Sequence, residues 1–178
     1  MQKLSVMDMN RLSVEDFRRS PKTPLIVVLD NVRSLHNVGS VLRTADAFRL
    51  QEVLLCGITA CPPQPEIHKT ALGAEDSVAW RHLDSTLEAV QQLRSDGYTV
   101  LAVEQAAGSV SLERLTLRSD GRYALVLGHE VRGVDQAVVD ACDGCIEIPQ
   151  FVTKHSLNVS VAAGLVIWDF FKQLGIPQ

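Results

Sequence analysis

Two stretches in the second half of the chain decide the fold, YALVLGHEVRGVD (residues 123–135) and CIEIPQFVTKHSLNVSVAAGLVIWDFF (residues 145–171). Each stretch begins with a short apolar run, 123–127 and 145–148, of the length expected for a buried parallel strand. Each run then breaks into a loop of small and polar residues. Because ligands bind outside the carboxyl ends of parallel strands, we expect a site at these two loops.

The segment 157–171 predicts a helix that is apolar on nearly every face. Such a helix must be buried, either by its own chain or by a partner. A chain of 178 residues offers little core in which to hide it. We therefore expect this C-terminal helix to lie in the interface of a homodimer.

Upstream, strands alternate with helices. Apolar runs predict strands at 25–30, 52–58 and 98–104, and helical spacing predicts helices at 38–50 and 85–97. The segment 68–83 predicts a short helix, a turn at Gly73 and a short strand near 78–80. Ser13 can cap a short helix that runs through Phe17. The pattern indicates an α/β fold with a mainly parallel sheet flanked by helices.

Length and composition indicate a single domain over 1–178, with a short extension (1–22) before a core (23–178). Hydrophobic residues at 46% against 21% charged exclude a disordered protein. With neither a membrane-spanning apolar run nor a signal-peptide pattern, we expect a cytoplasmic protein. The net charge of −4 argues against strong non-specific binding of nucleic acid.

The four cysteines allow two interpretations. The spacings CGITAC and CDGC, from Cys56, Cys61, Cys142 and Cys145, could supply four thiolates to a zinc ion. However, Cys56 and Cys145 lie in apolar strand-like runs, where cysteine behaves as a small hydrophobic residue. We expect reduced, structural cysteines and no metal.

Five polar residues fall in or beside the predicted loops, although each has an ordinary explanation. Asn37 could be a helix N-cap, and Ser156 or Asn158 could cap the last helix. Arg43 could extend its guanidinium to solvent, and Glu130 could be an exposed turn carboxylate or could pair with Arg43. Because all five are predicted to approach one edge of the sheet, together they indicate a site.

Three segments then resemble a known family in order and spacing: DNVRSLHNVGSVLRTADAF (30–48), LVLGHEVRGVD (125–135) and IEIPQFVTKHSLNVSVAAG (146–164). They are similar to the three motifs of the SpoU/TrmH-type RNA ribose 2′-O-methyltransferases of the SPOUT superfamily, and KTALGAEDSVAW (69–80) is also typical of that family. The resemblance implies a C-terminal trefoil knot, an S-adenosylmethionine site in the knot, a homodimer and a tRNA or rRNA substrate.

Carried over position by position, the resemblance implies two sets of site residues. The catalytic positions are Asn37, Arg43, Glu130 and Asn158. The cofactor-binding positions are Gly128, Ile148, Ser156 and Leu157, and Glu104 joins them by its place after the third predicted strand.

The negative net charge indicates that RNA would contact a local basic patch, for which we select Arg18, Arg19, Arg33, Lys69 and Arg132. Two other functions stay open at this point. One is a non-catalytic RNA-binding or assembly protein on the same fold. The other is a small-molecule nucleotide-binding enzyme, which the lack of glycine-rich phosphate loops disfavours.

Overall fold

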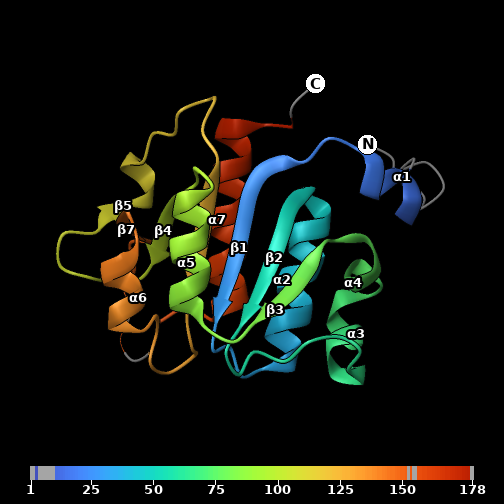
Figure 1. Cartoon of the computed structure of the whole chain (residues 1–178), viewed down its shortest axis with the longest axis horizontal. Helices are drawn as coiled ribbons and strands as arrows, with labels where there is room; N and C mark the ends of the chain where they lie inside the picture. Colours follow the sequence, from blue (N-terminus) through green and yellow to red (C-terminus); the bar gives the residue numbers. More distant parts are fainter. Residues whose placement is uncertain (1–2, 4–10, 152, 154–155, 177–178) are drawn as a thin grey trace.

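The computed structural model describes residue 3, residues 11–151, residue 153 and residues 156–176. Its centre is a seven-stranded sheet in the order β3-β2-β1-β6-β4-β7-β5, and every pairing in it is parallel (Figure 1). The strands are β1 Thr23–Asp30, β2 Leu50–Cys56, β3 Trp80–Leu83, β4 Thr99–Val103, β5 Val110–Ser111, β6 Tyr123–Leu127 and β7 Gly144–Glu147. The predicted α/β architecture with a parallel sheet is confirmed.

Helices cover both faces of the sheet (Figure 1). They are α1 Val14–Arg19, α2 Leu35–Ala47, α3 Pro65–Ala71, α4 Ala74–Ser77, α5 Thr86–Ser95, the 3₁₀ turn η2 Leu112–Arg114, α6 Gln136–Ala141 and α7 Val159–Leu174. Helices α2 and α7 pack on one face, with α3 and α4 lying against α2. Helices α5 and α6 pack on the other face.

The central strand β1 shows why both faces need cover. Leu25, Val27 and Leu29 belong to the cluster that α2 and α7 close, whereas Ile26 and Val28 belong to the cluster that α5 and α6 close. All five are at most 3% exposed. Successive side chains of a strand point to opposite faces, so a continuous apolar run is what a strand buried on both sides requires.

Some predicted boundaries are wrong, and one helix was not predicted. Helix α2 begins at residue 35 instead of 38 because the Ser34 hydroxyl caps it by accepting the Asn37 N–H, at 3.4 Å. Asn37 is therefore inside the first turn and is not the N-cap. The short strand expected near 78–80 is β3, which begins at Trp80. Helix α6 was not predicted; Asp135 caps it by accepting the Ala137 N–H at 2.9 Å.

A buried carboxylate ties together the loops at the carboxyl edge of the sheet. Asp30, at the end of β1, is 2% exposed. Its Oδ1 accepts the Thr86 hydroxyl at 2.6 Å, and its Oδ2 accepts the Asp135 N–H at 3.1 Å. One side chain thus joins the end of β1 to the start of α5 and to the segment before α6.

The cysteines lie in apolar surroundings. Cys56 is fully buried in β2, and burial raises the pKa of its thiol to about 12. Burial also raises the pKa of Cys142 to about 12. Within the described residues there is no group of three or more His, Cys, Asp or Glu side chains that could hold a metal ion.

Some predictions stay untested. Part of the N-terminal extension (1–2 and 4–10) and part of the loop before α7 (152, 154–155) lie outside the described residues. The single-domain division and the trefoil knot implied by the resemblance remain predictions. None of the helices in the described part of the chain is long and apolar enough to cross a membrane.

Candidate active site

A pocket of about 230 Å³ lies at the carboxyl ends of β4, β6 and β7, where the sequence predicts a site. We call it the loop pocket. Its walls are the segments that follow these three strands and the beginning of α7. It is lined by residues 103–105, 127–133, 147–148, 150, 156–157, 159 and 162.

All five predicted cofactor-binding residues line the loop pocket: Glu104, Gly128, Ile148, Ser156 and Leu157. They come from three separate parts of the chain, which the order of the strands brings together because β4 lies between β6 and β7. The Glu104 carboxylate is held in place by two main-chain donors, the Gln105 N–H at 2.9 Å and the Val134 N–H at 3.1 Å.

Glycines set the shape of the loop after β6. A Cβ atom at Gly128 would lie 2.1 Å from the carbonyl carbon of Gly133, so this close approach of two main-chain segments requires glycine. Gly133 itself has φ +69°, and a Cβ atom there would lie 2.0 Å from the Glu104 carboxylate. The loop can therefore fold against Glu104 only with these glycines.

Three predicted catalytic residues form one chain of hydrogen bonds beside the loop pocket. The Glu130 Oε1 accepts the Asn37 side-chain N–H at 3.0 Å, and the Asn37 Oδ1 accepts the Asn158 side-chain N–H at 3.1 Å. Glu130 also accepts the main-chain N–H groups of Arg33, at 3.1 Å, and Ser34, at 2.9 Å. Segments more than 90 residues apart in sequence are joined in this way.

These donors decide the charge of Glu130. Desolvation raises the pKa of the carboxyl. The hydrogen bonds from the main-chain N–H groups of Ser34, Glu130 itself and Arg33, and from the Asn37 side chain, together outweigh it, so the pKa lies below its ordinary value. Glu130 is therefore an ionised acceptor near neutral pH. Asn158, which also caps α7 by accepting the Ser160 N–H at 2.9 Å, keeps its amide fixed toward Asn37.

Arg43 lies elsewhere. It makes no hydrogen bond or ion pair with any described residue, so the suggested pairing with Glu130 is not formed in the described part of the chain. The reason is helical geometry: six residues along α2 place Arg43 about 240° around the axis from Asn37. Arg43 instead lines a second pocket of about 430 Å³, the α2–α3 pocket, with Ser40, Thr44, Ala47, Phe48, Lys69 and Thr70.

The predicted RNA-binding residues do not gather at one place. Arg132 lines the loop pocket, and Arg33 lines a separate hollow beside Glu130. Lys69 lies in the α2–α3 pocket. Near the start of the described chain, Arg18 donates to the main-chain oxygen of Asp76 and Arg19 pairs with Glu15 at 2.6 Å.

Sequence reasoning missed several residues of the loop pocket, among them two polar residues beside the IP pair at 148–149. Gln150 closes the loop before α7, because its Oε1 accepts the Leu157 N–H at 2.8 Å. Glu147, the last residue of β7, adds a carboxylate to the wall. The only signal in the sequence is that each residue flanks the dipeptide Ile148-Pro149. Polar residues beside such a dipeptide are too common to identify a site.

Comparison with known proteins identifies the family. The sequence model of the SpoU rRNA Methylase family matches residues 24–168. The 23S rRNA (guanosine-2′-O-)-methyltransferase RlmB of Nitrosomonas europaea is 33% identical over 162 residues, which cover 90% of this chain and 61% of that protein. Across several such curated relatives, the chain spans 58% to 66% of their length.

Solved structures agree on the fold. A putative RNA methyltransferase of the TrmH family from Porphyromonas gingivalis is 28% identical, with a TM-score of 0.75, over 85% of this chain and 59% of that one. The SpoU methyltransferase AviRb from Streptomyces viridochromogenes, solved in complex with AdoMet, also has a TM-score of 0.75, at 22% identity over 89% of this chain and 63% of that one. With the family model matching most of its length, the chain belongs to the SpoU rRNA Methylase family.

Proposed function

We propose that the protein transfers a methyl group from S-adenosylmethionine to a ribose 2′-hydroxyl of tRNA or rRNA. The observation that carries the proposal is the hydrogen-bonded chain Glu130–Asn37–Asn158 beside the loop pocket. The family supports it, because curated relatives are named as rRNA 2′-O-methyltransferases. A protein that modifies such RNA is expected in the cytoplasm.

The loop pocket fits S-adenosylmethionine. Apolar walls from Leu127, Ile148 and Leu157 suit the adenine ring. The close approach of Gly128 and Gly133 presents main-chain groups instead of side chains at the wall. Acidic side chains outnumber basic ones along the lining, with Glu104, Glu130 and Glu147 against Arg132, which suits a ligand with a cationic sulfonium.

The bound sulfonium supplies an activated methyl group, so the residues of the chain must align the ribose hydroxyl and stabilise the charge that develops on its oxygen. Glu130, held ionised by its donors, keeps the Asn37 and Asn158 amides in fixed positions. Arg43 is the group suited to the developing oxyanion, because its guanidinium stays protonated and can also hold a neighbouring phosphate.

We further propose that Arg43 acts in the loop pocket of a second copy of the chain. In the described chain it lies outside its own loop pocket. The same side of the molecule carries an apolar face on α7, where Val161, Leu165 and Trp168 are each 44–50% exposed. Trp168 packs with Phe48, next to Ala47 at the end of α2, at a ring-centroid distance of 5.6 Å. A homodimer through α7 would cover this face and bring α2 to the partner.

Mixed dimers test this arrangement. Arg43→Ala and Glu130→Gln are each expected to be inactive alone. When equal amounts are mixed and the subunits are exchanged under mild denaturation, about half of the dimers should contain one subunit of each kind. Each mixed dimer would hold one complete site of two, so the mixture should regain about a quarter of wild-type activity. Failure to regain activity, with a dimer proven by sedimentation, would place Arg43 in its own subunit's site. Trp168→Glu should convert the dimer to monomer; a wild-type monomer would remove the proposal.

The methyl transfer itself is tested with labelled S-adenosylmethionine and RNA from a strain that lacks the gene, separated into tRNA and rRNA. A labelled 2′-O-methyl nucleoside, identified by mass spectrometry, is the expected product. A protein that binds RNA but shows no binding of S-adenosylmethionine in calorimetry would instead be a non-catalytic RNA-binding protein. Stabilisation by other nucleotides alone would favour the small-molecule enzyme.

A further inference from the structure

The α2–α3 pocket differs in charge from the loop pocket and from the groove between β3 and α5. Its lining contains two cations, Arg43 and Lys69, and none of the described lining residues is acidic. Both cations are exposed. By contrast, the groove between β3 and α5 mixes Arg81 with Asp84 and Glu88. An uncompensated pair of cations in a hollow attracts an anion.

The hydroxyl groups of the α2–α3 pocket add acceptors. The Thr44 hydroxyl donates to the Ser40 carbonyl oxygen at 3.0 Å, and the Thr70 hydroxyl donates to the His36 carbonyl oxygen at 3.0 Å. Because each of these hydroxyl protons is used, their oxygens keep only acceptor capacity toward a ligand. The hydroxyl oxygens could accept a hydrogen bond from a sugar hydroxyl, and the two neighbouring cations could bind the phosphate next to that sugar.

An aromatic surface continues from the same pocket. Phe48 lines it and contacts Trp168 and Phe171, at ring-centroid distances of 5.6 and 5.1 Å. In the proposed homodimer the partner covers Trp168, so Phe48, which lines the pocket, is the ring left to contact an unpaired base. Phosphate, ribose and base thus each find a matching group at the pocket.

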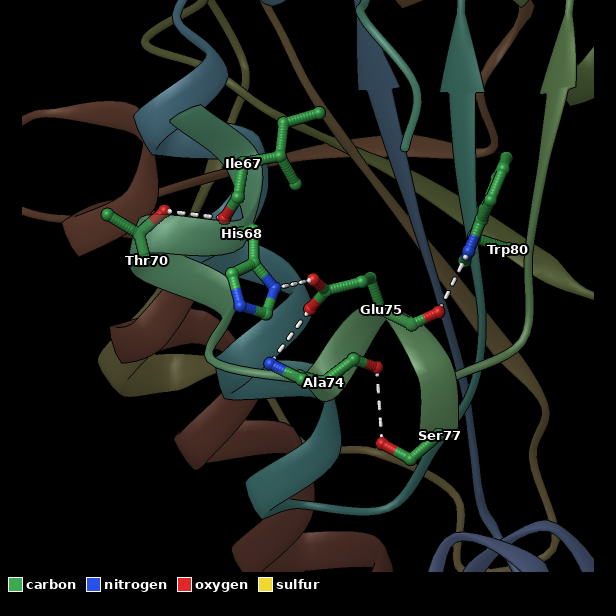
Figure 2. Close-up of polar contacts among 8 residues, drawn as sticks. Ile67, His68, Thr70, Ala74, Glu75, Ser77 and Trp80 are labelled. Atoms are coloured by element: carbon green, nitrogen blue, oxygen red, sulfur yellow. Dashed lines mark hydrogen bonds and ion pairs between the residues drawn. The ribbon is translucent and has the colours of Figure 1, made fainter. Parts of the chain in front are cut away.

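A local network of hydrogen bonds joins α3, which carries Lys69, to α4 (Figure 2). The Glu75 carboxylate accepts the Gly73 N–H at 3.0 Å and lies 2.5 Å from the His68 Nδ1, which locks α3 to α4. The Trp80 indole donates to the Glu75 carbonyl oxygen at 3.1 Å. Desolvation raises the pKa of Glu75, but the contacts with His68 and with main-chain N–H groups lower it by a larger amount. The pKa therefore lies below its ordinary value, and the carboxylate stays ionised.

Close packing holds α3 against α2. A Cβ atom at Gly39 would lie 2.3 Å from the Ile67 carbonyl oxygen and 2.1 Å from the Thr70 hydroxyl. Only glycine at this position lets the two helices approach so closely. The lysine and the arginine are therefore presented by a rigid pair of helices and not by a loose loop.

We infer that the α2–α3 pocket binds the ribose-phosphate backbone of an RNA strand, and that Lys69 is the residue that holds its phosphate beside Arg43. The inference rests on the proposed RNA-directed function and deepens it, because it assigns a backbone-binding role to α3. Lys69 positions the substrate and takes no part in the chemistry. Its loss should weaken RNA binding without changing turnover at saturation.

The test uses a fluorescent single-stranded oligoribonucleotide of mixed sequence, with binding followed by anisotropy at several salt concentrations. We expect Lys69→Ala to weaken binding about 5- to 10-fold, and the slope of log affinity against log salt should fall by about one. Lys69→Arg should retain binding, and Lys69→Glu should lose more than Lys69→Ala. A deoxyribonucleotide of the same sequence should bind wild-type protein more weakly, because it lacks the 2′-hydroxyl.

The matched control is Arg114→Ala, which removes one positive charge from an exposed side chain on η2, next to the edge strand β5. Its affinity and salt slope should equal those of the wild type. If Lys69→Ala binds like Arg114→Ala, the inference is wrong. RNA binding can be measured without methyl transfer. If the protein methylates no RNA but its RNA affinity still depends on Lys69, the proposed activity is wrong and the RNA-binding site is supported.

With an active enzyme, the same variant separates the two roles. Lys69→Ala should raise KM for RNA about as much as it weakens binding, while kcat stays within about twofold of wild type. The reason is that the lost contact would stabilise the bound substrate and the transition state equally. Calorimetry should show unchanged affinity for S-adenosylmethionine. A fall in kcat with unchanged KM would contradict a backbone-binding role.

Discussion

The two pockets of this protein have opposite character although one helix serves both. The loop pocket has three carboxylates and one arginine on its wall, and it is built from loops at the carboxyl edge of the sheet. The α2–α3 pocket has two cations and lies between helices. Helix α2 gives Asn37, 8% exposed, to the network beside the first pocket, and it gives the exposed Arg43 to the second.

This contrast explains how one chain can handle two ligands of opposite charge. A sulfonium compound is attracted to the acidic pocket, and an RNA backbone is attracted to the basic one. Within one chain, an ion pair between Glu130 and Arg43, which the sequence alone allowed, would neutralise both groups. Asn37, which binds Glu130, and Arg43 face different directions on α2, so the two charges do not pair within the described chain.

The largest effect is expected from Arg43→Ala. Removal of the guanidinium that stabilises the developing oxyanion should reduce methyl transfer about 10²- to 10³-fold. Affinity for S-adenosylmethionine, measured by calorimetry, should be almost unchanged, since Arg43 does not line the loop pocket of its own chain and is proposed to act on the ribose oxygen and not on the cofactor. Loss of cofactor affinity with turnover retained would show that the two pockets are not distinct.

Gly128→Ala should damage the loop pocket selectively. The new methyl group would lie 2.1 Å from the Gly133 main chain, which cannot move without displacing Glu104 and the loop after β6. We expect cofactor affinity to fall by about tenfold or more, since a displacement of this size costs about 1–3 kcal/mol. RNA affinity, measured by anisotropy, should remain; equal loss of both would indicate general unfolding, which a melting curve would detect.

Gly39→Ala is the matching change at the α2–α3 pocket. The methyl group would meet the Ile67 carbonyl oxygen and force α3 away from α2, at a cost of about 1–3 kcal/mol in the free energy of unfolding. The melting temperature should fall and RNA affinity should weaken, because Lys69 moves with α3. Cofactor affinity should be preserved. The opposite pattern, with cofactor lost and RNA retained, would contradict the assignment of the two pockets.

The smallest effect is the dependence of stability on pH through Glu130. Its pKa is lowered in the folded protein, so the stabilisation it provides is present above its ordinary value of 4.5 and is lost as the pH falls through the lowered pKa. The difference in melting temperature between wild type and Glu130→Gln should therefore be greatest near neutral pH and should shrink below about pH 4. A difference that is constant with pH would mean that Glu130 is not ionised in the network.

Much of the fold could be predicted because single stretches carry the signal. The continuous apolar runs of β1 and β6 predict buried parallel strands, since both faces of the sheet are covered. Short elements escaped prediction: α6 has only six residues, and α2 starts early because Ser34 caps it. A cap is a contact of one hydroxyl with one N–H group, and several nearby side chains could have made it.

For the site, the sequence singled out Glu130, Asn37 and Asn158, and it selected five residues that all line the loop pocket. It could not show where Arg43 lies relative to Glu130. That relation depends on the angular position of two residues on α2 and on which elements pack beside each face, and neither is encoded in the spacing of motifs. The same holds for Lys69, which neighbours Arg43 only because α3 packs on α2.

The sequence by itself therefore determined the α/β class, the parallel strands, the family and the residue types of the site. These follow from local periodicity and from short motifs, which are properties of neighbouring residues. Only the tertiary structure decided that the carboxylates and the two cations belong to separate pockets. The physical reason is that electrostatic character depends on distance in space, and close packing of Gly39 on Ile67 and of Gly133 on Glu104 brings together segments that are far apart along the chain.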